Sequence, residues 1–312
     1  MSKFMTHTAS GSLTALLQKE RIKILITDSG LGGISICAEI ARAFSLHPHF
    51  RDVSLVYFNA WPEQERGYNR LEDTTKRIQV FDKTLTGMMR FNPDIIMIAC
   101  NTLSVLYPRT NFSQHAPIPV IDTVDFGVDA MTKALQNKEN DQVVILGTLT
   151  TIASNVHRDR LLEKGISEHQ IVLQPCDQLA TAIEKGPDSH LVSEMIQTFM
   201  REAATKIDPF CDHLYGALCC THFAYCHEHF RETLAALTGK SVMIINPNHH
   251  MTDYLLSGCR DRLKETHVTI NVVSKIIWEV EKTRSIADRI RLISAETAEA
   301  LTGYTHQPDL FE

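Results

Sequence analysis

The chain has 312 residues, 44% of them hydrophobic, and a formal net charge of −6 at pH 7. A chain of this length buries a large core, and because single cores stop growing near roughly 250 to 300 residues, two subdomains are expected. Acidic and basic residues are interspersed, so the sequence lacks the basic stripe of a nucleic-acid-binding protein. The composition therefore favours a small molecule as the partner.

The eight cysteines are expected to be reduced thiols. The N-terminal residues lack the apolar segment of a secretory signal, and no apolar run approaches the roughly 20 residues that span a bilayer. A cytoplasmic location without membrane contact is the expectation, and disulfides are rare there. Packing, metal binding and catalysis remain as explanations for the cysteines.

Taken in chain order, residues 1–20 form a polar extension with a short helix predicted at 13–20. Short apolar segments rich in Ile, Val and Leu follow at 23–28, 53–58, 94–100, 119–122, 142–148, 171–176, 213–220 and 242–247. They do not alternate polar with apolar residues, which is typical of strands covered on both faces. Helical patterns lie between them at 70–90, 125–138, 150–164, 191–206 and 223–238. This order predicts an α/β fold with parallel strands.

Residues 273–302 have apolar side chains at approximately helical spacing, which predicts an amphipathic helical extension. Such a helix is more often a packing or dimer-contact element than a catalytic one, so a homodimer is one expectation. The last residues, HQPDLFE, contain a Gln-x-x-Leu-Phe pattern like that of peptides that dock on bacterial sliding clamps. A pattern this short arises easily by chance, and no function is predicted from it.

The segment TDSGLGGIS (27–35) follows a predicted strand and opens a helix. In open parallel sheets the ligand crevice lies outside the carboxyl ends of the strands, and free amides at a helix N-terminus suit an anion. The segment does not match a dinucleotide motif, because its glycines read Gly-Leu-Gly-Gly and Asp28 would repel a pyrophosphate. Asp28 is therefore either a helix-capping residue or a site carboxylate.

Two cysteines end predicted strands in matching settings, Cys100 in ACNT and Cys220 in CCTH. Asp28 precedes Cys100, and Thr148 precedes Cys220, by the same interval of 72 residues. A duplicated half-domain with one cysteine per half would produce this interval. The helix N-terminus predicted after Cys100 is expected to lower the thiol pKa from about 8.5 toward neutrality.

Three other kinds of site explain these cysteines less well. Zinc sites usually show two separated ligand pairs, whereas Cys and His crowd into the single segment 219–229. A Cys-His hydrolase explains one cysteine and not two, and a pyridoxal enzyme needs a lysine that the strand ends lack. Two thiols can instead remove a proton from one face of a carbon and deliver a proton to the other face. The pattern favours stereoinversion, with no metal and no cofactor.

The segments TDSGLGGIS, IACNT, LGTLTTIAS, ATAIEKG and CCTH, in this order, resemble those of glutamate racemases in the cofactor-independent aspartate/glutamate racemase superfamily. The similarity covers about residues 21–255. The resemblance implies two parallel-sheet α/β domains related by a pseudo-twofold axis, with the active site in the cleft between them. It implies racemisation of an amino acid, with the conversion of L-glutamate to D-glutamate as the first expectation for the reaction, and a role in cytoplasmic peptidoglycan biosynthesis.

The domains expected from this resemblance form a discontinuous arrangement. The first domain comprises residues 21–123 plus 243–272, and the second comprises 124–242. Residues 1–20 and 273–312 are the N-terminal extension and the helical C-terminal extension.

The resemblance also implies roles for residues that match the family's motifs. Cys100 and Cys220 are the paired acid/base thiols. Asp28 assists the first thiol, and Glu184 with His222 assists the second. The positions that hold the substrate's carboxylates and ammonium group are Ser29, Asn101, Thr102, Thr148, Thr151 and Thr221.

One segment departs from the family pattern. Glutamate racemases usually carry Pro-Tyr-Gly shortly after the second strand, whereas Glu65-Arg66-Gly67 stands in that place here. Arg66 is either a bidentate partner of a substrate carboxylate or a solvated loop residue. The departure keeps two alternatives open, a related substrate such as aspartate and a non-catalytic binding or regulatory protein on the same fold.

Overall fold

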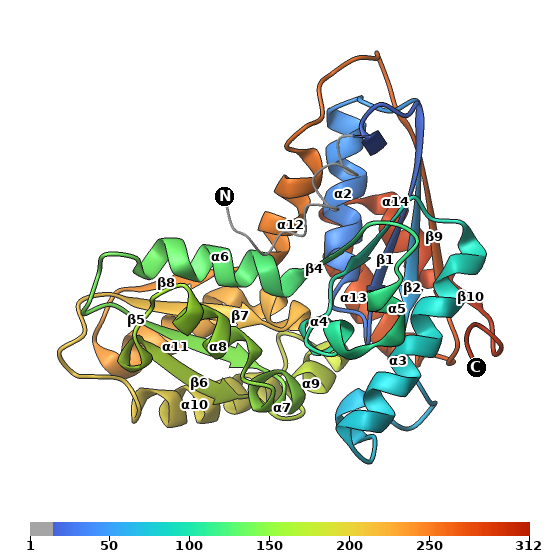
Figure 1. Cartoon of the computed structure of the whole chain (residues 1–312). Coiled ribbons are helices and arrows are strands. Elements are labelled where there is room, and N and C mark those ends of the chain that lie inside the picture. The colour runs from blue at the N-terminus through green and yellow to red at the C-terminus, as the bar shows by residue number, and fades with distance from the viewer. Residues whose placement is uncertain (1–14) are drawn as a thin grey trace. The chain divides into compact units, whose positions relative to one another are not determined.

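The computed structural model describes residues 15–312, so most of the expected N-terminal extension lies outside the described residues. The chain forms two compact units, unit 1 (Met1–Asp122 with Met251–Glu312) and unit 2 (Thr123–His250). Each unit contains one parallel sheet (Figure 1). The second boundary lies eight residues later than the sequence suggested, because strand β8 (Val242–Ile245) pairs with a strand of unit 2.

Unit 1 is built on a six-stranded parallel sheet with the order β10-β9-β2-β1-β3-β4. Its strands are β1 (Arg21–Asp28), β2 (Asp52–Asn59), β3 (Ile95–Ile98), β4 (Val120–Asp122), β9 (His267–Ser274) and β10 (Thr305–His306). Its helices are α2 (Ile34–Leu46), α3 (Thr74–Met88), α4 (Asn101–Ser104), α5 (Asn111–Gln114), α13 (Val280–Ile290) and α14 (Ala295–Thr302). The four apolar segments predicted as strands in this part of the chain are confirmed. Ile24, Leu25 and Ile26 of β1 are fully buried, as the continuous apolar pattern requires.

Unit 2 is built on a four-stranded parallel sheet with the order β6-β5-β7-β8. Its other strands are β5 (Gln142–Gly147), β6 (Ile171–Pro175) and β7 (Leu214–Cys219). Its helices are α6 (Thr123–Leu135), α7 (Leu149–Ala153), α8 (Val156–Glu163), α9 (Leu179–Lys185), α10 (His190–Ala204), α11 (His227–Thr238) and the start of α12 (Pro247–Leu256). This strand order repeats β2-β1-β3-β4 of unit 1, with Cys100 after β3 and Cys220 after β7. The topology supports the duplication inferred from the 72-residue interval.

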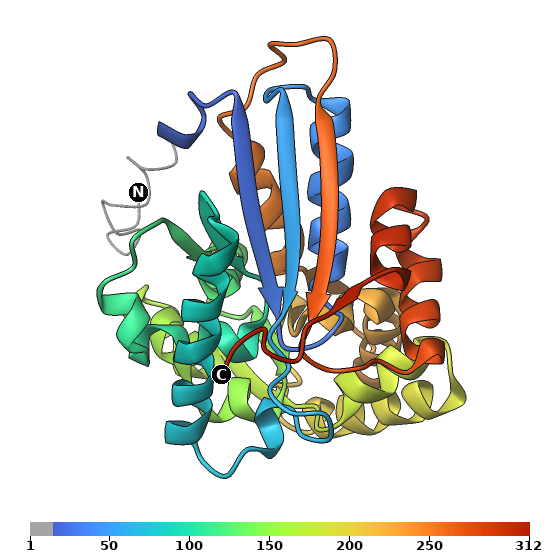
Figure 2. The ribbon, with the colours of Figure 1, turned by 90° about the vertical axis from the view of Figure 1, so that its right-hand side faces the viewer.

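The C-terminal part of the chain is not the single helical extension that the apolar spacing predicted. Strand β9 pairs with β2 over its whole length, and two separate helices, α13 and α14, follow it. Figure 2 shows β1, β2 and β9 side by side, with the red C-terminal segment passing their carboxyl ends. The segment HVTINVVS is rich in β-branched residues, but its first five residues are exposed or half-buried, so it lacks the continuous apolar pattern of the other strands.

The C-terminal tail packs into the core of unit 1. Leu310 is fully buried, and the ring of Phe311 lies 5.9 Å from that of Phe58, centroid to centroid. Arg90 donates a hydrogen bond to the carbonyl of Leu310, and Lys275 Nζ donates to the carbonyl of Phe311 at 2.9 Å. The Leu-Phe pair of the clamp-like pattern therefore contributes to this unit's own core, which explains its apolar residues without an external partner.

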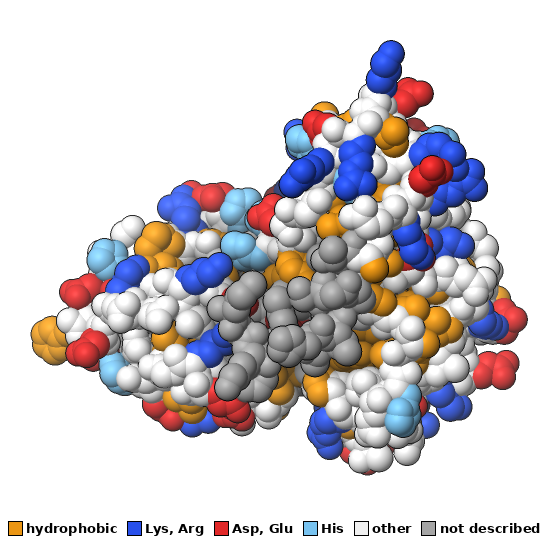
Figure 3. Space-filling model, turned by 45° about the horizontal axis from the view of Figure 1, so that its top comes forward, with side chains coloured by type: hydrophobic (Ala, Val, Ile, Leu, Met, Phe, Trp, Pro, Cys, Tyr) orange, Lys and Arg blue, Asp and Glu red, His pale blue; other side chains and the backbone are white. Residues whose placement is uncertain are grey.

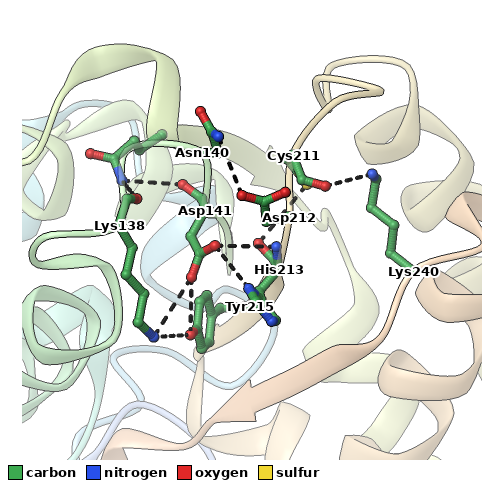
Figure 4. A network of polar contacts seen from close by, with 9 residues as sticks. Lys138, Asn140, Asp141, Cys211, Asp212, His213, Tyr215 and Lys240 are labelled. Atoms are coloured by element: carbon green, nitrogen blue, oxygen red, sulfur yellow. Dashed lines mark hydrogen bonds and ion pairs between the residues drawn. The ribbon is translucent and has the colours of Figure 1, made fainter.

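A polar network joins the starts of β5 and β7 in unit 2 (Figure 4). The carboxylate of Asp141 is buried and accepts hydrogen bonds from the backbone N–H of His213 at 3.2 Å and from the Tyr215 hydroxyl at 3.4 Å. Lys138 Nζ donates to the Tyr215 hydroxyl at 2.8 Å and lies 3.7 Å from the Asp141 carboxylate. A buried carboxylate is tolerated only with such partners. The network therefore stabilises the edge of the sheet formed by the amino ends of the strands.

Charges of both signs are mixed on the surface that Figure 3 shows, where Lys and Arg side chains lie among Asp and Glu. Ion pairs such as Arg21–Asp52 and Arg51–Glu20 are present in unit 1. The face shown has no continuous basic stripe. Within residues 15–312, none of the helices has the length and apolar character needed to cross a bilayer.

His157 in α8 makes the stability of the fold depend on pH. Burial, with a smaller contribution from Arg160, lowers the pKa of His157 from 6.5 to about 4. Between these two pH values the unfolded chain binds the proton more readily, so the free energy of unfolding is expected to fall as the pH falls. The expected loss from pH 7 to 4.5 is about 2 to 3 kcal/mol. Urea unfolding at both pH values tests this, and an equally large fall in His157→Gln would contradict the assignment.

Candidate active site

The loop after β1 places a buried carboxylate at the carboxyl edge of the unit 1 sheet. Asp28 is the last residue of β1 and is fully buried, and its Oδ1 accepts a hydrogen bond from the Gly30 N–H at 2.9 Å. A Cβ at Gly33 would lie 2.8 Å from Asp28 Oδ2, so the glycine is needed for the start of α2 to pack against this carboxylate. Gly33 thus serves close packing around Asp28, and Gly30 donates a backbone hydrogen bond to it.

Cys100 lies between β3 and α4 and is only 6% exposed. Its Sγ lies 3.1 Å from Ser29 Oγ. Burial first, and then the charge of Asp28, raise the pKa of the Cys100 thiol well above its ordinary value, while hydrogen bonds from Ser29 lower it by less. The expectation that a helix N-terminus brings this pKa toward neutrality is therefore wrong. Helix α4 has only four residues, and the cost of burying a thiolate outweighs its effect.

The residues after Cys100 complete what we call the Cys100 cluster. Asn101 and Thr102 form the first turn of α4 and are 1% and 3% exposed. The structure therefore brings together five of the predicted residues at the carboxyl edge of unit 1. The Cys100 cluster comprises Asp28, Ser29, Cys100, Asn101 and Thr102.

The loop that departs from the family pattern follows β2. Arg66 is exposed and forms ion pairs with Glu63 at 2.7 Å and with Glu72 at 3.0 Å. A Cβ at Gly67 would lie 2.7 Å from the Trp61 ring, so the glycine lets the chain pass this indole. The carboxylate partners of Arg66 belong to its own surface segment, which favours the solvated-loop interpretation.

Tyr68, next to Gly67, is a buried residue that the sequence reading missed. It is 2% exposed, and its hydroxyl lies 3.5 Å from Thr84 Oγ1. Burial raises the pKa of Tyr68, and Cys100 adds to this effect through electrostatic interaction. The available signal was a tyrosine directly after the glycine that occupies the family's Pro-Tyr-Gly position.

Cys220 lies at the end of β7 in contact with a histidine-carboxylate pair. His222 Nδ1 lies 3.7 Å from Cys220 Sγ, and His222 Nε2 lies 2.6 Å from Glu184 Oε1. All three residues are buried, and α9 supplies Glu184 from a distant part of the sequence. Burial lowers the pKa of His222, but the charge of Glu184 and the hydrogen bonds with Cys220 and Glu184 raise it more, so it lies well above 6.5. At neutral pH the imidazolium donates one N–H to the thiol sulfur and the other to the carboxylate.

Threonine hydroxyls lie at the neighbouring strand end. Thr148 follows β5 and caps α7, where its Oγ1 accepts a hydrogen bond from the Thr151 N–H at 3.3 Å and lies 3.0 Å from Thr151 Oγ1. The β5–β7 register pairs Gly147 with Cys219, so Thr148 and Cys220 leave adjacent strand ends. Thr221 follows Cys220 and is 1% exposed. The Cys220 cluster comprises Thr148, Thr151, Glu184, Cys220, Thr221 and His222.

The other six cysteines are buried, except Cys259, which is partly exposed. All eight cysteines are free thiols. Cys219 is fully buried beside Cys220, and burial raises its pKa. In the part of the chain that the structure describes, no group of three or more His, Cys, Asp or Glu side chains is placed to hold a metal ion.

The sequence was compared with family models and with known proteins, and both comparisons give matches. A family model described as Asp/Glu/Hydantoin racemase matches residues 24–255, which include both clusters. The glutamate racemase of Campylobacter jejuni subsp. jejuni is 31% identical over 146 residues, 46% of this chain and 53% of that protein. The glutamate racemase of Aquifex pyrophilus is 25% identical over 215 residues, covering 68% of this chain and 76% of that protein.

A solved structure shares the fold. The glutamate racemase of Francisella tularensis subsp. tularensis SCHU S4, crystallised with D-glutamate, matches with a TM-score of 0.63 and 20% sequence identity. The match covers 92% of this chain and 95% of that protein. The likeness establishes the α/β fold with two parallel sheets.

Proposed function

Because the chain belongs to the Asp/Glu/Hydantoin racemase family, a family of isomerases, we propose that it racemises glutamate by exchange of the α-proton between two thiols, without a cofactor. The observation that carries this proposal is the pair of buried thiols at equivalent strand ends. Cys100 has Asp28 beside it, and Cys220 has His222 and Glu184. One buried cysteine is ordinary packing, whereas two with titratable partners at repeated positions fit a two-base reaction.

The surroundings of the two thiols suggest how the proton moves. The raised pKa of Cys100 keeps it protonated and ready to donate, whereas Cys220 has the His222 imidazolium 3.7 Å from its sulfur and is proposed to act as the base. In this direction the Cys220 thiolate takes the α-proton as the Cα–H bond breaks, and the Cys100 thiol delivers its proton to the opposite face of the carbon. Both sulfurs have then exchanged protonation states. In the reverse direction Cys100 is the base.

The buried hydroxyl and amide groups of the two clusters are proposed to hold the substrate. Ser29, Asn101 and Thr102 accompany Cys100, and Thr148, Thr151 and Thr221 accompany Cys220. Donors fixed in a water-poor site stabilise carboxylates and the developing carbanion more effectively than water does. The relatives named glutamate racemase, and the D-glutamate in the Francisella structure, support an acidic amino acid as the substrate.

Aspartate is the second candidate substrate. The Pro-Tyr-Gly position is occupied by Glu65-Arg66-Gly67, and the charge of Arg66 is matched by Glu63 and Glu72. The segment that helps to fix the substrate in glutamate racemases therefore differs here, which supports testing an acidic substrate with a shorter side chain.

A deuterium-exchange screen is expected to show catalysed loss of the α-proton. L- and D-glutamate, L- and D-aspartate and neutral amino acids are incubated with the protein in deuterated water and followed by proton NMR. We expect the glutamate signal to disappear fastest, from either enantiomer. Faster exchange of aspartate would change the substrate. Absence of exchange with every amino acid would favour a non-catalytic binding protein on this fold.

A further inference from the structure

We propose that Ser274 and Asn59 are positioning residues for the loop that contacts Cys100. Strand β9, which carries Ser274, would then help to hold the Cys100 cluster in place. Strand β9 lies beyond residues 24–255, which the family model matches. The inference rests on the proposed role of Cys100 and adds two residues that none of the sequence motifs include.

The geometry begins with three adjacent strand ends. Asp28 of β1 pairs in register with Asn59 of β2, and Asn59 pairs with Ser274 of β9. All three are the last residues of their strands, and all three are fully buried. A buried row of polar side chains at the carboxyl edge of a parallel sheet lies where a site is expected.

Hydrogen bonds connect this row to the thiol. The Ser274 hydroxyl lies 3.3 Å from Asn59 Oδ1 and 3.0 Å from the carbonyl of Ile276, which share its single proton. Asn59 Nδ2 donates to the Gly30 carbonyl at 2.9 Å. Gly30 follows Ser29, whose hydroxyl is 3.1 Å from Cys100 Sγ. A continuous series of contacts thus runs from the C-terminal strand to the sulfur.

The C-terminal segment holds Ser274 firmly in place. The Gln307 N–H donates to the Ser274 carbonyl at 2.8 Å, and the buried residues Leu310 and Phe311 follow. A second, independent contact fixes the loop after Asn59. The side chain of Gln64 donates to the Ile277 carbonyl at 2.7 Å and accepts from the Ile277 N–H at 3.0 Å. Both loops that follow β1 and β2 therefore depend on residues 274–277.

The alternative is that these polar groups only satisfy one another in the core. That role predicts a uniform loss of stability when any of them is removed. A positioning role predicts a local effect, in which Cys100 responds and Cys220 does not. Because Cys100 is only 6% exposed and Ser29 of this loop lies against its sulfur, release of the loop is expected to expose the thiol and so to raise its rate of alkylation.

The test measures alkylation of each thiol in the full chain. Iodoacetamide labelling at pH 8, followed by peptide mass spectrometry, gives the rate at Cys100 relative to that at Cys220. In Ser274→Ala we expect this ratio to rise about threefold or more, because local opening of the loop admits the reagent to the sulfur. Asn59→Ala is expected to raise the ratio too, and the double variant to add nothing further, since both act through one series of contacts. Thr283→Val removes a buried hydroxyl that bonds only within α13 and is the matched control.

Three results of the labelling experiment would overturn the inference: an unchanged ratio in Ser274→Ala, equal acceleration of both thiols, or strictly additive effects in the double variant. Turnover in the deuterium assay is expected to fall about tenfold in Ser274→Ala. Wild-type turnover in that variant would also overturn it. Alkylation requires no catalysis, so a wild-type protein that fails to exchange any α-proton contradicts the proposed function and leaves the Ser274 test interpretable.

Discussion

Replacing either Cys100 or Cys220 by serine is expected to abolish racemisation, with a loss of at least about 10³-fold in turnover. Each inversion needs a base on one face of the α-carbon and an acid on the other, and a serine hydroxyl is too weak an acid to replace either thiol. Circular dichroism of the amino-acid product, starting from each enantiomer, measures the loss. The two substitutions should be equally severe because neither thiol can serve both faces.

Cys259→Ser is the matched control for this prediction. Cys259 is partly exposed, and its thiol donates a weak hydrogen bond to the carbonyl of Leu255 at 3.7 Å, so serine is expected to preserve activity. Near-normal racemisation by Cys100→Ser or Cys220→Ser would show that the two-base assignment is wrong. A folded and inactive variant at both positions, with an active control, supports it.

Glu184→Gln is expected to give the second largest effect, a loss of turnover of about 10²-fold together with a lower pKa of His222. Burial alone lowers this pKa, and the charge of Glu184 is the largest of the effects that raise it. Glutamine keeps the shape and a hydrogen-bonding side chain but removes the charge. The imidazole is then expected to be neutral at pH 7, so a positive charge no longer faces the Cys220 sulfur. NMR titration of the His222 ring measures the change.

The same variant changes how stability depends on pH. In the wild type the folded pKa of His222 lies above its unfolded value of about 6.5, so this pair stabilises the fold fully below pH 6.5. The stabilisation is lost as the pH rises through the folded pKa. In Glu184→Gln this dependence is expected to disappear, and stability at pH 6 to fall by about 3 kcal/mol, as for breaking other buried pairs. Glu228→Gln, which changes an exposed carboxylate in unit 2, is the control. An unchanged His222 titration would contradict the pairing.

Much of the fold followed from local patterns in the sequence. Continuous apolar segments predicted eight strands of the two parallel sheets, because strands covered on both faces need no polar alternation. Strand β9 was not predicted, because the first five of its eight residues are exposed or half-buried and it has no continuous apolar segment. The boundary between the units after His250 was not predicted either. It depends on the pairing of β8 with β7 in the sheet of unit 2, and no local sequence pattern specifies which strand β8 pairs with.

The amino-acid sequence by itself determined which residues carry the proposed chemistry. Cys100 and Cys220 follow equivalent strands in a repeated topology, and the short motifs TDSG and CCTH single out Asp28 and His222. The tertiary structure alone decided the protonation states, because burial and charges from distant segments set them. Asp28 and enclosure raise the pKa of Cys100, and Glu184, 38 residues away along the chain, keeps His222 protonated. It also brought Ser274 to the end of β2, since strand order depends on packing of the whole sheet and not on any local pattern.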